Sequence, residues 1–481
     1  MSDSVFRNYI AGEWVEGNKG SVANISPADI NDVIGQYAQA DKAQTEAAIS
    51  AAAVGQAEWA KSGLEQRYSV LMAIGDELIA RKDELGELLA REEGKTLAEG
   101  VGETYRSGQF FHYYAAEVLR QMGETADSVR PGIEIETRRE PVGVVGIITP
   151  WNFPTATGAW KIAPALAFGN AVVWKPANQV PASAWALTEI ISRQGLPAGA
   201  FNLVMGPGAD VGDVLINSRG INALTFTGSL DTGRKVAAAT AVNLVKCQLE
   251  MGSKNALVVL DDADLDNAVE CAVGGAFGGT GQKCTASSRL IVTEGIHDRF
   301  VAAMVERMKK LVVGHPLKPG VHIGAVADAR QMEQNLNYLE VAKKEGGNLV
   351  YGGEVLTEET EGYYMQPALF TETTNQMTIN REEAFAPIAC IIRVKDYDEA
   401  LATLNDTNFG LTGGICTESL KYATDFKRNA KTGCVMVNLP TAGTDYHVPF
   451  GGRKDSSFGP REQGTYAKEF YTVVKTTYIR G

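Results

Sequence analysis

The segment around Cys284 has the composition of a reactive site rather than of a packed core. It reads Gly278-Gly-Thr-Gly-Gln-Lys-Cys284-Thr-Ala-Ser-Ser, so the cysteine follows a glycine-rich run and precedes small polar residues. Structural cysteines usually have apolar neighbours, whereas flexible backbone with free N–H groups can stabilise a thiolate or an oxyanion. Cys284 is therefore the predicted nucleophile. The remaining cysteines lie in segments typical of strand or helix core: Cys247, Cys271, Cys390, Cys416 and Cys434.

Two polar side chains stand where they could assist such a nucleophile. Glu250, in Gln248-Leu-Glu-Met-Gly-Ser-Lys-Asn255, ends an extended run before a glycine turn, so its carboxylate can project into a cleft as a general base. A solvated turn residue is the alternative interpretation. Asn152, in Pro150-Trp-Asn-Phe-Pro154, is held between two prolines and could donate to an oxyanion, although asparagine is also common in such turns for backbone reasons.

Two glycine-rich turns are candidate cofactor loops, Met205-Gly-Pro-Gly-Ala-Asp-Val-Gly212 and Phe226-Thr-Gly-Ser-Leu-Asp-Thr-Gly233. In the second, Gly228 permits a tight turn, and Ser229 can cap a following helix whose free N–H groups would face a pyrophosphate. Neither turn matches GxGxxG, so a plain strand-to-helix connection is an equal alternative for each.

Alternating helices and β-branched runs must position these segments. Residues 44 to about 119 have a helical pattern, in which Leu71, Ile74 and Leu78 share one face. After residue 122 an alternating and then continuously apolar stretch predicts an arm that leads into a buried strand. Short strands are then predicted at 171–174, 201–204, 223–226 and 244–249, separated by helices at 181–194, 209–218 and 229–239. This βα alternation predicts a mostly parallel, doubly wound sheet, which binds ligands at the carboxyl ends of its strands.

A second α/β domain and a β arm are predicted for the rest of the chain. Strands at 256–260, 290–293 and 389–394 are expected, with helices at 297–313 and 325–345 between them. The tail at 467–479 is rich in Tyr, Thr and Val and would be an exposed edge strand if unpaired. Pairing with the 133–139 arm, of the same or another subunit, would cover it.

Composition limits the functional classes. The chain has 481 residues, a net charge of −13, 44% hydrophobic and 21% charged residues, as in ordinary globular proteins of two or three domains. The acidic balance argues against nucleic-acid or anionic-membrane partners and favours small-molecule ligands. Charged residues near the N-terminus and interruptions by Pro150, Lys161 and Pro164 exclude a signal peptide and a membrane span. Six scattered cysteines favour the cytoplasm, and five histidines without ligand spacing predict no metal site.

Together these segments resemble the aldehyde dehydrogenase superfamily along essentially the whole chain. The motifs that carry the resemblance are Thr149-Pro-Trp-Asn-Phe-Pro154, Trp174-Lys-Pro-Ala177, Phe226-Thr-Gly-Ser229, Leu249-Glu-Met-Gly252, Gly281-Gln-Lys-Cys284, Glu382-Glu-Ala-Phe-Ala-Pro387 and Pro449-Phe-Gly-Gly452. The resemblance implies a Rossmann-type cofactor domain (1–121 and 142–252), a catalytic domain (253–452), and an oligomerisation arm and tail (122–141 and 453–481). A homodimer or homotetramer would follow.

The resemblance also implies a role for each matching residue. Cys284 would form a thiohemiacetal with the aldehyde, with Asn152 and the Cys284 N–H holding the oxyanion, and Glu250 would activate water to hydrolyse the thioester. NADP or NAD would be held by these residues: Ile148, Trp151, Lys175, Asn178, Gly228, Ser229, Glu383 and Phe385. The positions that match the substrate pocket are Phe153, Trp160, Arg289 and Phe450.

Departures from the family pattern bear on specificity. Asn178 stands three residues after Lys175, where strongly NAD-specific members carry a glutamate that repels a 2′-phosphate, so NADP is expected to be accepted. Ser457 stands where a glycine is usual. The Gln248–Gly252 and Gly281–Arg289 segments look most like the 2-oxoglutarate semialdehyde (2,5-dioxopentanoate) dehydrogenase branch.

The residue that would bind the substrate carboxylate stays open at this stage. Trp160 replaces an arginine found in some succinic semialdehyde dehydrogenases, which leaves Arg106, Lys161 and Arg289 as candidates beside a structural ion-pair role for each. Succinic semialdehyde or another short aliphatic aldehyde is the alternative substrate.

Three other functional classes fit less well. A CoA-acylating enzyme has no use for the base Glu250, and a cysteine hydrolase would need a Cys–His pairing that the sequence does not offer. A catalytically silent protein on this scaffold is disfavoured because Asn152, Lys175, Cys284 and Glu383 are all present.

Overall fold

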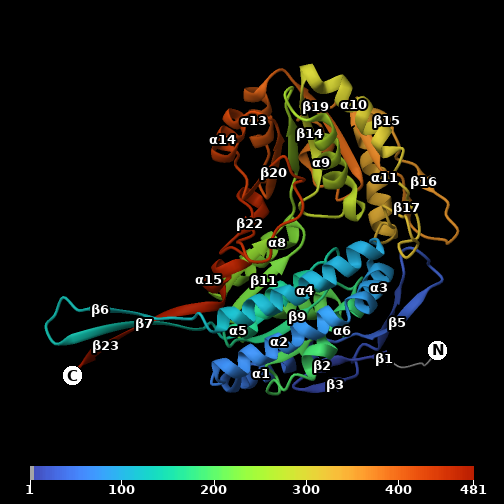
Figure 1. Ribbon diagram of the computed structural model, residues 1–481. Coiled ribbons are helices and arrows are strands. Elements are labelled where there is room, and N and C mark those ends of the chain that lie inside the picture. The colour runs from blue at the N-terminus through green and yellow to red at the C-terminus, as the bar shows by residue number, and fades with distance from the viewer. Residues whose placement is uncertain (1–4) are drawn as a thin grey trace.

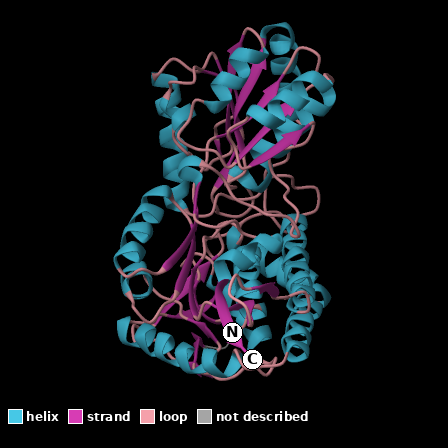
Figure 2. Cartoon of the chain, turned by 90° about the vertical axis from the view of Figure 1, so that its left-hand side faces the viewer, coloured by secondary structure: helices cyan, strands magenta, loops and turns pink. Residues whose placement is uncertain are grey.

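The computed structural model describes residues 5–481, which form two lobes and a projecting arm (Figure 1). Each lobe is built on a mostly parallel sheet with helices on its faces (Figure 2). In the described part of the chain, no helix is long and apolar enough to cross a membrane. Likewise, no group of three or more His, Cys, Asp or Glu side chains within residues 5–481 is arranged to hold a metal ion.

The predicted helical stretch after residue 44 is confirmed as four helices. They are α1 (Lys42–Trp59), α2 (Leu64–Ala80), α3 (Lys82–Glu93) and α4 (Leu97–Val118). Gly94, with φ of 94°, ends α3 in a left-handed conformation that glycine adopts without strain. Thr96 and Glu99 then form a capping box that starts α4.

The first sheet has eight strands, and its central part is parallel as predicted. In spatial order the strands are β22 (Ser457–Phe458), β12 (Lys246–Glu250), β11 (Ala223–Thr227), β8 (Val144–Ile148), β9 (Ala171–Lys175), β10 (Phe201–Leu203), β2 (Asn8–Ile10) and β3 (Glu13–Val15). Its connecting helices are α5 (Pro154–Ala167), α6 (Pro181–Ser192), α7 (Asp213–Asn217) and α8 (Leu230–Val242). The strand residues alternate between two cores: Trp174 packs in the cluster with α2, α4, α5 and α6, and Val173 in the cluster with α1.

One connection in this lobe differs from the prediction. The stretch 209–218 was expected to be a single helix, but Gly208–Gly212 form one π-helical turn and only Asp213–Asn217 are α-helical. Two glycines in the first turn disfavour a regular α-helix there, because glycine loses the most backbone entropy on ordering.

The second sheet has seven strands in the order β15 (Asn348–Tyr351), β18 (Ala368–Thr371), β19 (Ile388–Val394), β14 (Ser287–Thr293), β13 (Asn255–Val259), β20 (Thr412–Cys416) and β21 (Cys434–Val437). Its helices are α9 (Leu265–Phe277), α10 (Glu294–Met308), α11 (Ala329–Lys344), α12 (Thr378–Arg381), α13 (Tyr397–Asn405) and α14 (Leu420–Asn429). The predicted strands β13, β14 and β19 and the helices α10 and α11 are confirmed. The remaining elements, including the glycine-containing α9 and β20, were missed.

The arm is a three-stranded sheet that projects from the first lobe (Figure 1). Its strands are β6 (Glu124–Asp127), β7 (Ile133–Pro141) and β23 (Thr472–Arg480). The tail pairs with the arm of the same chain, antiparallel from Thr472 opposite Pro141 to Arg480 opposite Ile133. The tail strand begins later than predicted, because 468–471 form the short helix α15 (Lys468–Tyr471).

The sheets do not divide the chain at residue 453. Strand β22 lies beyond that predicted boundary, yet it pairs with β12 at the edge of the eight-stranded sheet. Smaller sheets complete the fold, from β1 (Val5–Phe6), β5 (Val33–Ala38) and β4 (Ser21–Ile25), and from β16 (Val355–Leu356) and β17 (Tyr364–Met365).

Candidate active site

Most residues selected from the sequence line one cavity of about 490 Å³. They are Trp151, Asn152, Phe153, Trp160, Gly228, Ser229, Glu250, Cys284, Glu383, Phe385 and Phe450. The cavity therefore brings together residues from both lobes, with the thiol, the carboxyl and the amide expected to do chemistry. Ile148, Lys175, Asn178 and Arg289 are not among its lining residues.

The first lobe contributes residues from the carboxyl ends of its parallel strands. Glu250 is the last residue of β12, Gly228 follows β11, and Asn152 follows β8. Neighbouring strands in register place these ends side by side, as Thr227 opposite Glu250 shows. This is the edge at which doubly wound sheets bind ligands.

The loop that carries Cys284, residues 278–286, precedes β14 and has an unusual backbone conformation. Gly279, Thr280 and Gly281 all have positive φ, of 60°, 56° and 67°. A Cβ on Gly281 would lie 2.2 Å from the carbonyl oxygen of Ala386, so only glycine fits. The Asn255 amide then fixes the loop by donating to the carbonyl oxygens of Cys284 at 2.7 Å and Ala286 at 3.0 Å.

The thiol itself is less activated than the polar sequence suggested. Cys284 is only partly exposed. Burial raises the pKa of the Cys284 thiol well above its ordinary value, and the nearby carboxyls of Glu383 and Glu250 raise it further. In the protein alone the thiol is therefore protonated at neutral pH, and its deprotonation needs a partner in the cavity.

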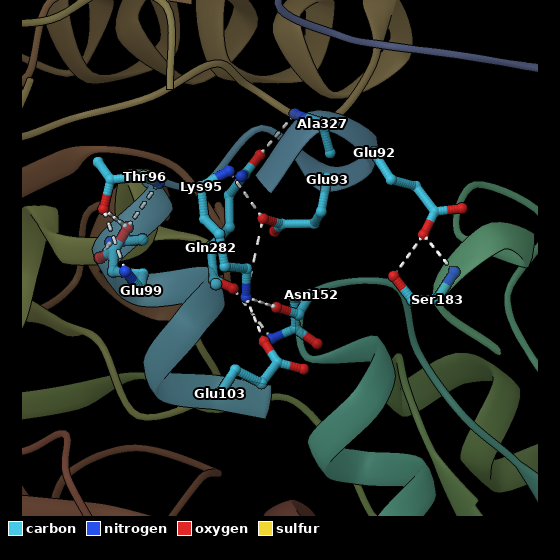
Figure 3. Close-up of polar contacts among 12 residues, drawn as sticks. Glu92, Glu93, Lys95, Thr96, Glu99, Glu103, Asn152, Ser183, Gln282 and Ala327 are labelled. Carbon is cyan, nitrogen blue, oxygen red and sulfur yellow. Dashed lines mark hydrogen bonds and ion pairs between the residues drawn. The ribbon is translucent and has the colours of Figure 1, made fainter. Parts of the chain in front are cut away.

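Asn152 is held from two sides (Figure 3). Its side-chain nitrogen donates to the carbonyl oxygen of Gln282 at 2.9 Å, two residues before Cys284. Its own carbonyl oxygen accepts from the Lys95 ammonium at 2.7 Å. An amide has two N–H groups, so one remains to face a substrate oxygen.

A buried ion cluster at the start of α4 supports this arrangement, and the sequence analysis missed it. Lys95 lies 2.7 Å from Glu103 and 3.7 Å from Glu93, with all three side chains at most 4% exposed. Glu103 also accepts from the backbone N–H groups of Thr155 and Ala156 at 3.0 Å, which caps α5 directly after Asn152. Figure 3 shows the end of the Lys95 side chain joined by dashed lines to both Glu103 and Asn152. Neither helix α5 nor the distant acid that caps it was among the predictions from the sequence.

Glu250 is buried at the end of β12 and bonded to the opposite strand. Its Oε2 accepts a hydrogen bond of 2.5 Å from the hydroxyl of Ser457 on β22. Burial raises the pKa of Glu250 well above its ordinary value, and the neighbouring carboxylate of Glu462 raises it further. A base with a raised pKa can accept a proton near neutral pH.

Glu462 belongs to a second buried ion pair. It bonds to Lys161 of α5, which also donates to the Thr225 hydroxyl at 2.7 Å. The side chains of Lys161 and Glu462 are 0% and 2% exposed. This pair corrects one expectation, because Lys161 was a candidate for the substrate carboxylate and is instead committed to a carboxylate of the protein.

The structure also differs from the expectation for Arg289. It was expected in the substrate pocket, but it is 1% exposed on β14 and its donors are taken by Lys254, Asn375, Thr403 and Leu404. Arg106, on α4, makes no hydrogen bond or ion pair that falls within residues 5–481. Its guanidinium carbon lies 5.3 Å from the centre of the Tyr446 ring.

The side of the cavity reached from α4 and α5 is aromatic. The Trp160 ring is 6.0 Å from Phe450 and 5.8 Å from Phe110, and Phe110 is 6.3 Å from Tyr446, centre to centre. The aromatic wall thus runs from the cavity toward Arg106. The indole N–H of Trp160 is buried and has no acceptor among the described residues.

The strand ends around Gly228 and Lys175 fit a dinucleotide. Gly228 and Ser229 line the cavity, and Ser229 caps α8 by accepting from Thr232 N–H. Lys175, at the end of β9, is buried, and within residues 5–481 its ammonium bonds only to the Pro176 carbonyl oxygen, at 3.1 Å. Burial lowers the pKa of Lys175 to about 8. This buried ammonium has no carboxylate partner among the described residues. It lies at a strand end, where hydroxyl or phosphate oxygens of a ligand could bind it.

The other five predicted cofactor positions come from both lobes. Ile148 lies opposite Lys175 in the register of β8 and β9. Glu383 accepts from Ser253 N–H at 2.7 Å, and burial raises the pKa of Glu383 to about 7. Asn178 is exposed in the turn after β9 and does not cap α6, whose N-cap is Val180. Phe385, with φ of 57°, packs edge-to-face on Trp151 at 5.4 Å.

Comparison with known sequences agrees with this geometry. The Aldehyde dehydrogenase family matches residues 14–477. The chain is 41% identical over 480 residues to alpha-ketoglutaric semialdehyde dehydrogenase of Bacillus subtilis, a match that covers 99% of this chain and 98% of the relative.

Solved structures give the same result. Betaine aldehyde dehydrogenase of Staphylococcus aureus in complex with NAD+ superposes with a TM-score of 0.96 at 33% identity, covering 98% of this chain and 95% of that one. A 3,6-anhydro-L-galactose dehydrogenase in complex with NADP also has a TM-score of 0.96, at 32% identity, covering 99% of this chain and 100% of that one. The chain therefore belongs to the aldehyde dehydrogenase family and is an NAD(P)-dependent oxidoreductase.

Proposed function

We propose that this enzyme oxidises 2-oxoglutarate semialdehyde (2,5-dioxopentanoate) to 2-oxoglutarate, with Cys284 as nucleophile and Glu250 as general base. The observation that carries the mechanism is the single cavity that holds Cys284, Glu250 and Asn152 together. Similarity to the Bacillus subtilis relative supports the substrate.

Acylation begins at the thiol. The Cys284 thiol gives its proton to water in the cavity and its sulfur attacks the aldehyde carbon. The thiohemiacetal oxygen then lies where the free N–H of the Asn152 amide and the Cys284 backbone N–H can hold it. The bond from Asn152 to Gln282 fixes the amide relative to the cysteine loop. A bound nicotinamide cofactor supplies the acceptor for the hydride that leaves this carbon.

Deacylation then requires a base. Water attacks the thioester, and the Glu250 carboxylate takes the proton from that water. Because burial raises the pKa of Glu250, the carboxylate is a stronger base than an exposed glutamate. The thiol leaves as the carboxylic acid is released.

The cofactor would be held by Lys175, Glu383, Gly228 and Ser229, with Ile148, Trp151, Asn178 and Phe385 around them. Asn178 carries no charge that would repel a 2′-phosphate, so we expect NADP+ to be used at least as well as NAD+.

We further propose that Arg106 binds the carboxylate of the substrate. Of the three candidates from the sequence, Lys161 and Arg289 are committed to protein acceptors, while Arg106 has no anionic partner in residues 5–481. Trp160 lines the cavity together with Cys284, and its unpartnered indole N–H can donate to the 2-oxo group. In this proposal Arg106 meets the carboxylate at the far end of the substrate, and Trp160 meets the adjacent 2-oxo group.

The mechanism is tested with Glu250→Gln. We expect one equivalent of NAD(P)H per site in the first turnover, followed by slow turnover, reduced about 10²–10⁴-fold, while an acyl adduct on Cys284 accumulates and is detected by mass spectrometry. Near-normal turnover would remove Glu250 from the mechanism. Loss of the first turnover would mean that Glu250 also activates Cys284.

The substrate is tested with a panel of aldehydes of similar length, compared by kcat/KM. We expect 2,5-dioxopentanoate to exceed succinic semialdehyde and uncharged aldehydes. Arg106→Met should lower kcat/KM for the carboxylated substrates about 10-fold or more, as expected when a charge-assisted hydrogen bond is lost, and leave uncharged aldehydes unchanged. Arg120→Met, just beyond α4, is the matched control. Equal losses for charged and uncharged aldehydes would refute the role of Arg106.

We also propose that the protein is a cytoplasmic homodimer or homotetramer. The exposed apolar residues Val473, Val474, Tyr478 and Ile479 on β23 support an interface at the arm. Six free cysteines support a reducing compartment.

A further inference from the structure

Ser457 faces the predicted general base directly across two paired strands. The short strand β22 adds antiparallel to the edge of β12, and its register places Ser457 opposite Glu250 and Phe458 opposite Leu249. Side chains of directly paired residues lie on the same face of a sheet, only about 4.5–5.5 Å apart at their Cβ atoms. The position of the Ser457 hydroxyl next to Glu250 is therefore fixed by backbone pairing of two strands and not by a flexible loop.

The direction of the hydrogen bond is determined by a third group. The Ser457 oxygen accepts from the backbone N–H of Gly452 at 2.6 Å. Its single proton is thus free to be donated to Oε2 of Glu250, 2.5 Å away. The other carboxyl oxygen, Oε1, lies against Gly451, where a Cβ would be 2.7 Å away.

The remaining groups around the Glu250 carboxyl are charged or titratable. Lys161 of α5 and Arg461 favour its charged form, whereas Glu462 disfavours it. Glu250 in turn raises the pKa of Cys284 and, less directly, that of Cys434 on β21. Within residues 5–481, Ser457 is the group that forms a hydrogen bond with this carboxyl, so removing its hydroxyl changes a single defined contact.

We propose that Ser457 is a positioning residue, whose hydroxyl donates to the Glu250 carboxylate and holds the base on the β22 side of the cavity between turnovers. The inference rests on the proposed role of Glu250 in deacylation. A donor to a carboxylate stabilises the charged form, which is the form that can act as a base. Ser457 thereby keeps the base ionised to lower pH than burial beside Glu462 would allow.

The proposal predicts the direction in which the pH profile of deacylation shifts when the Ser457 hydroxyl is removed. Without the hydroxyl the pKa of Glu250 rises, so the base is protonated over a wider acidic range. The acid limb of the deacylation rate should therefore move to higher pH, by about one unit for the loss of a hydrogen bond to a charged group. Hydride transfer in the first turnover does not use the base in the proposed mechanism, and its rate should stay within a few-fold.

The experiment compares Ser457→Ala, Ser457→Gly and Ser457→Thr in the full-length enzyme. Deacylation is followed by single-turnover kinetics across pH, with the first-turnover burst of NAD(P)H measured in the same samples. Ser456→Ala is the matched control, because the Ser456 hydroxyl bonds to Gly410 N–H at 3.0 Å and to the Gly252 carbonyl oxygen at 2.9 Å and does not touch Glu250.

Support requires that the acid limb shifts upward in Ser457→Ala and Ser457→Gly, returns toward the wild type in Ser457→Thr, and does not move in Ser456→Ala. Unshifted profiles in both Ser457→Ala and Ser457→Gly would overturn the proposal, as would a shift of the same size in Ser456→Ala. A uniform loss of rate at every pH would also overturn it, because it indicates only a structural role. Normal turnover by Glu250→Gln would instead refute the proposed function itself, so the two failures are separable.

Discussion

Replacing Asn178 by glutamate should change the cofactor preference. Asn178 is exposed in the turn after β9, and Lys175 lies three residues before it at the strand end. A bound 2′-phosphate carries about −1.5 to −2 charges at neutral pH. Asn178→Glu would therefore add a like charge beside the phosphate of NADP+ but not beside the hydroxyl of NAD+.

The exposure of Asn178 sets the size of the effect. Two unit charges about 4 Å apart repel by ~1 kcal/mol in water and ~4 kcal/mol near a protein surface. An exposed turn lies toward the lower limit, so we expect ~1–2 kcal/mol, which is about a 5- to 30-fold fall in the ratio of kcat/KM for NADP+ to that for NAD+. Because exposed charges are screened, the fall should shrink at high salt.

The assay is kcat/KM for both cofactors in the wild type, in Asn178→Glu and in Asn178→Gln. Glutamine has the size of glutamate without its charge, so it separates electrostatic repulsion from a change of shape. Wild-type enzyme should use NADP+ at least as well as NAD+. The reasoning is wrong if the wild type is strongly specific for NAD+, if Asn178→Glu changes the ratio by less than about threefold, or if Asn178→Gln changes it equally.

Three further predictions concern the thiol, the buried ion pair and the arm. Cys284→Ala should abolish dehydrogenase activity, while alanine at Cys247, Cys271, Cys390, Cys416 or Cys434 leaves it within a few-fold; a second inactive but folded cysteine variant would contradict the assignment. Lys161→Met should lower the free energy of unfolding, measured in urea, by about 3–5 kcal/mol, because it leaves Glu462 buried without a counter-charge. Adding Glu462→Gln should restore most of that stability. If it restores none, the loss of the ion pair is not the cause. Truncation after Tyr471 removes β23 from the arm and should convert a dimer or tetramer into a monomer in sedimentation, whereas a wild-type monomer would refute the proposed interface.

Residues whose role depends on local backbone could be identified from the sequence. Glycines before Cys284 and prolines around Asn152 mark irregular backbone, and the structure places both segments at the cavity. The βα alternation likewise predicted the parallel strands whose ends hold Glu250 and Gly228. These signals lie within a few residues of the side chain concerned.

Residues whose role depends on distant partners could not be assigned in this way. Ser457 and Glu250 are 207 positions apart, and Lys161 and Glu462 are 301 apart. Arg289 shows the same limit, because the strand was predicted to start one residue after it, at 290, and the carbonyl oxygens that surround its guanidinium come from other elements. The sequence alone does not reveal whether a charged side chain will pair with another group of the protein or stay available to a ligand, as we propose for Arg106.

The geometry of the site depends on contact between the two lobes. Glu99, at the start of α4, accepts from Gly279 N–H at 2.7 Å in the cysteine loop, and Asn152 bonds to Gln282 of the same loop. Glu383 reaches back to Ser253 N–H, between β12 and β13. The proposed nucleophile Cys284 and the proposed oxyanion donor Asn152 therefore keep their relative positions through hydrogen bonds between the lobes. Because catalysis depends on sub-ångström placement of reacting groups, we expect these bonds to affect the reaction although they lie away from the reacting atoms.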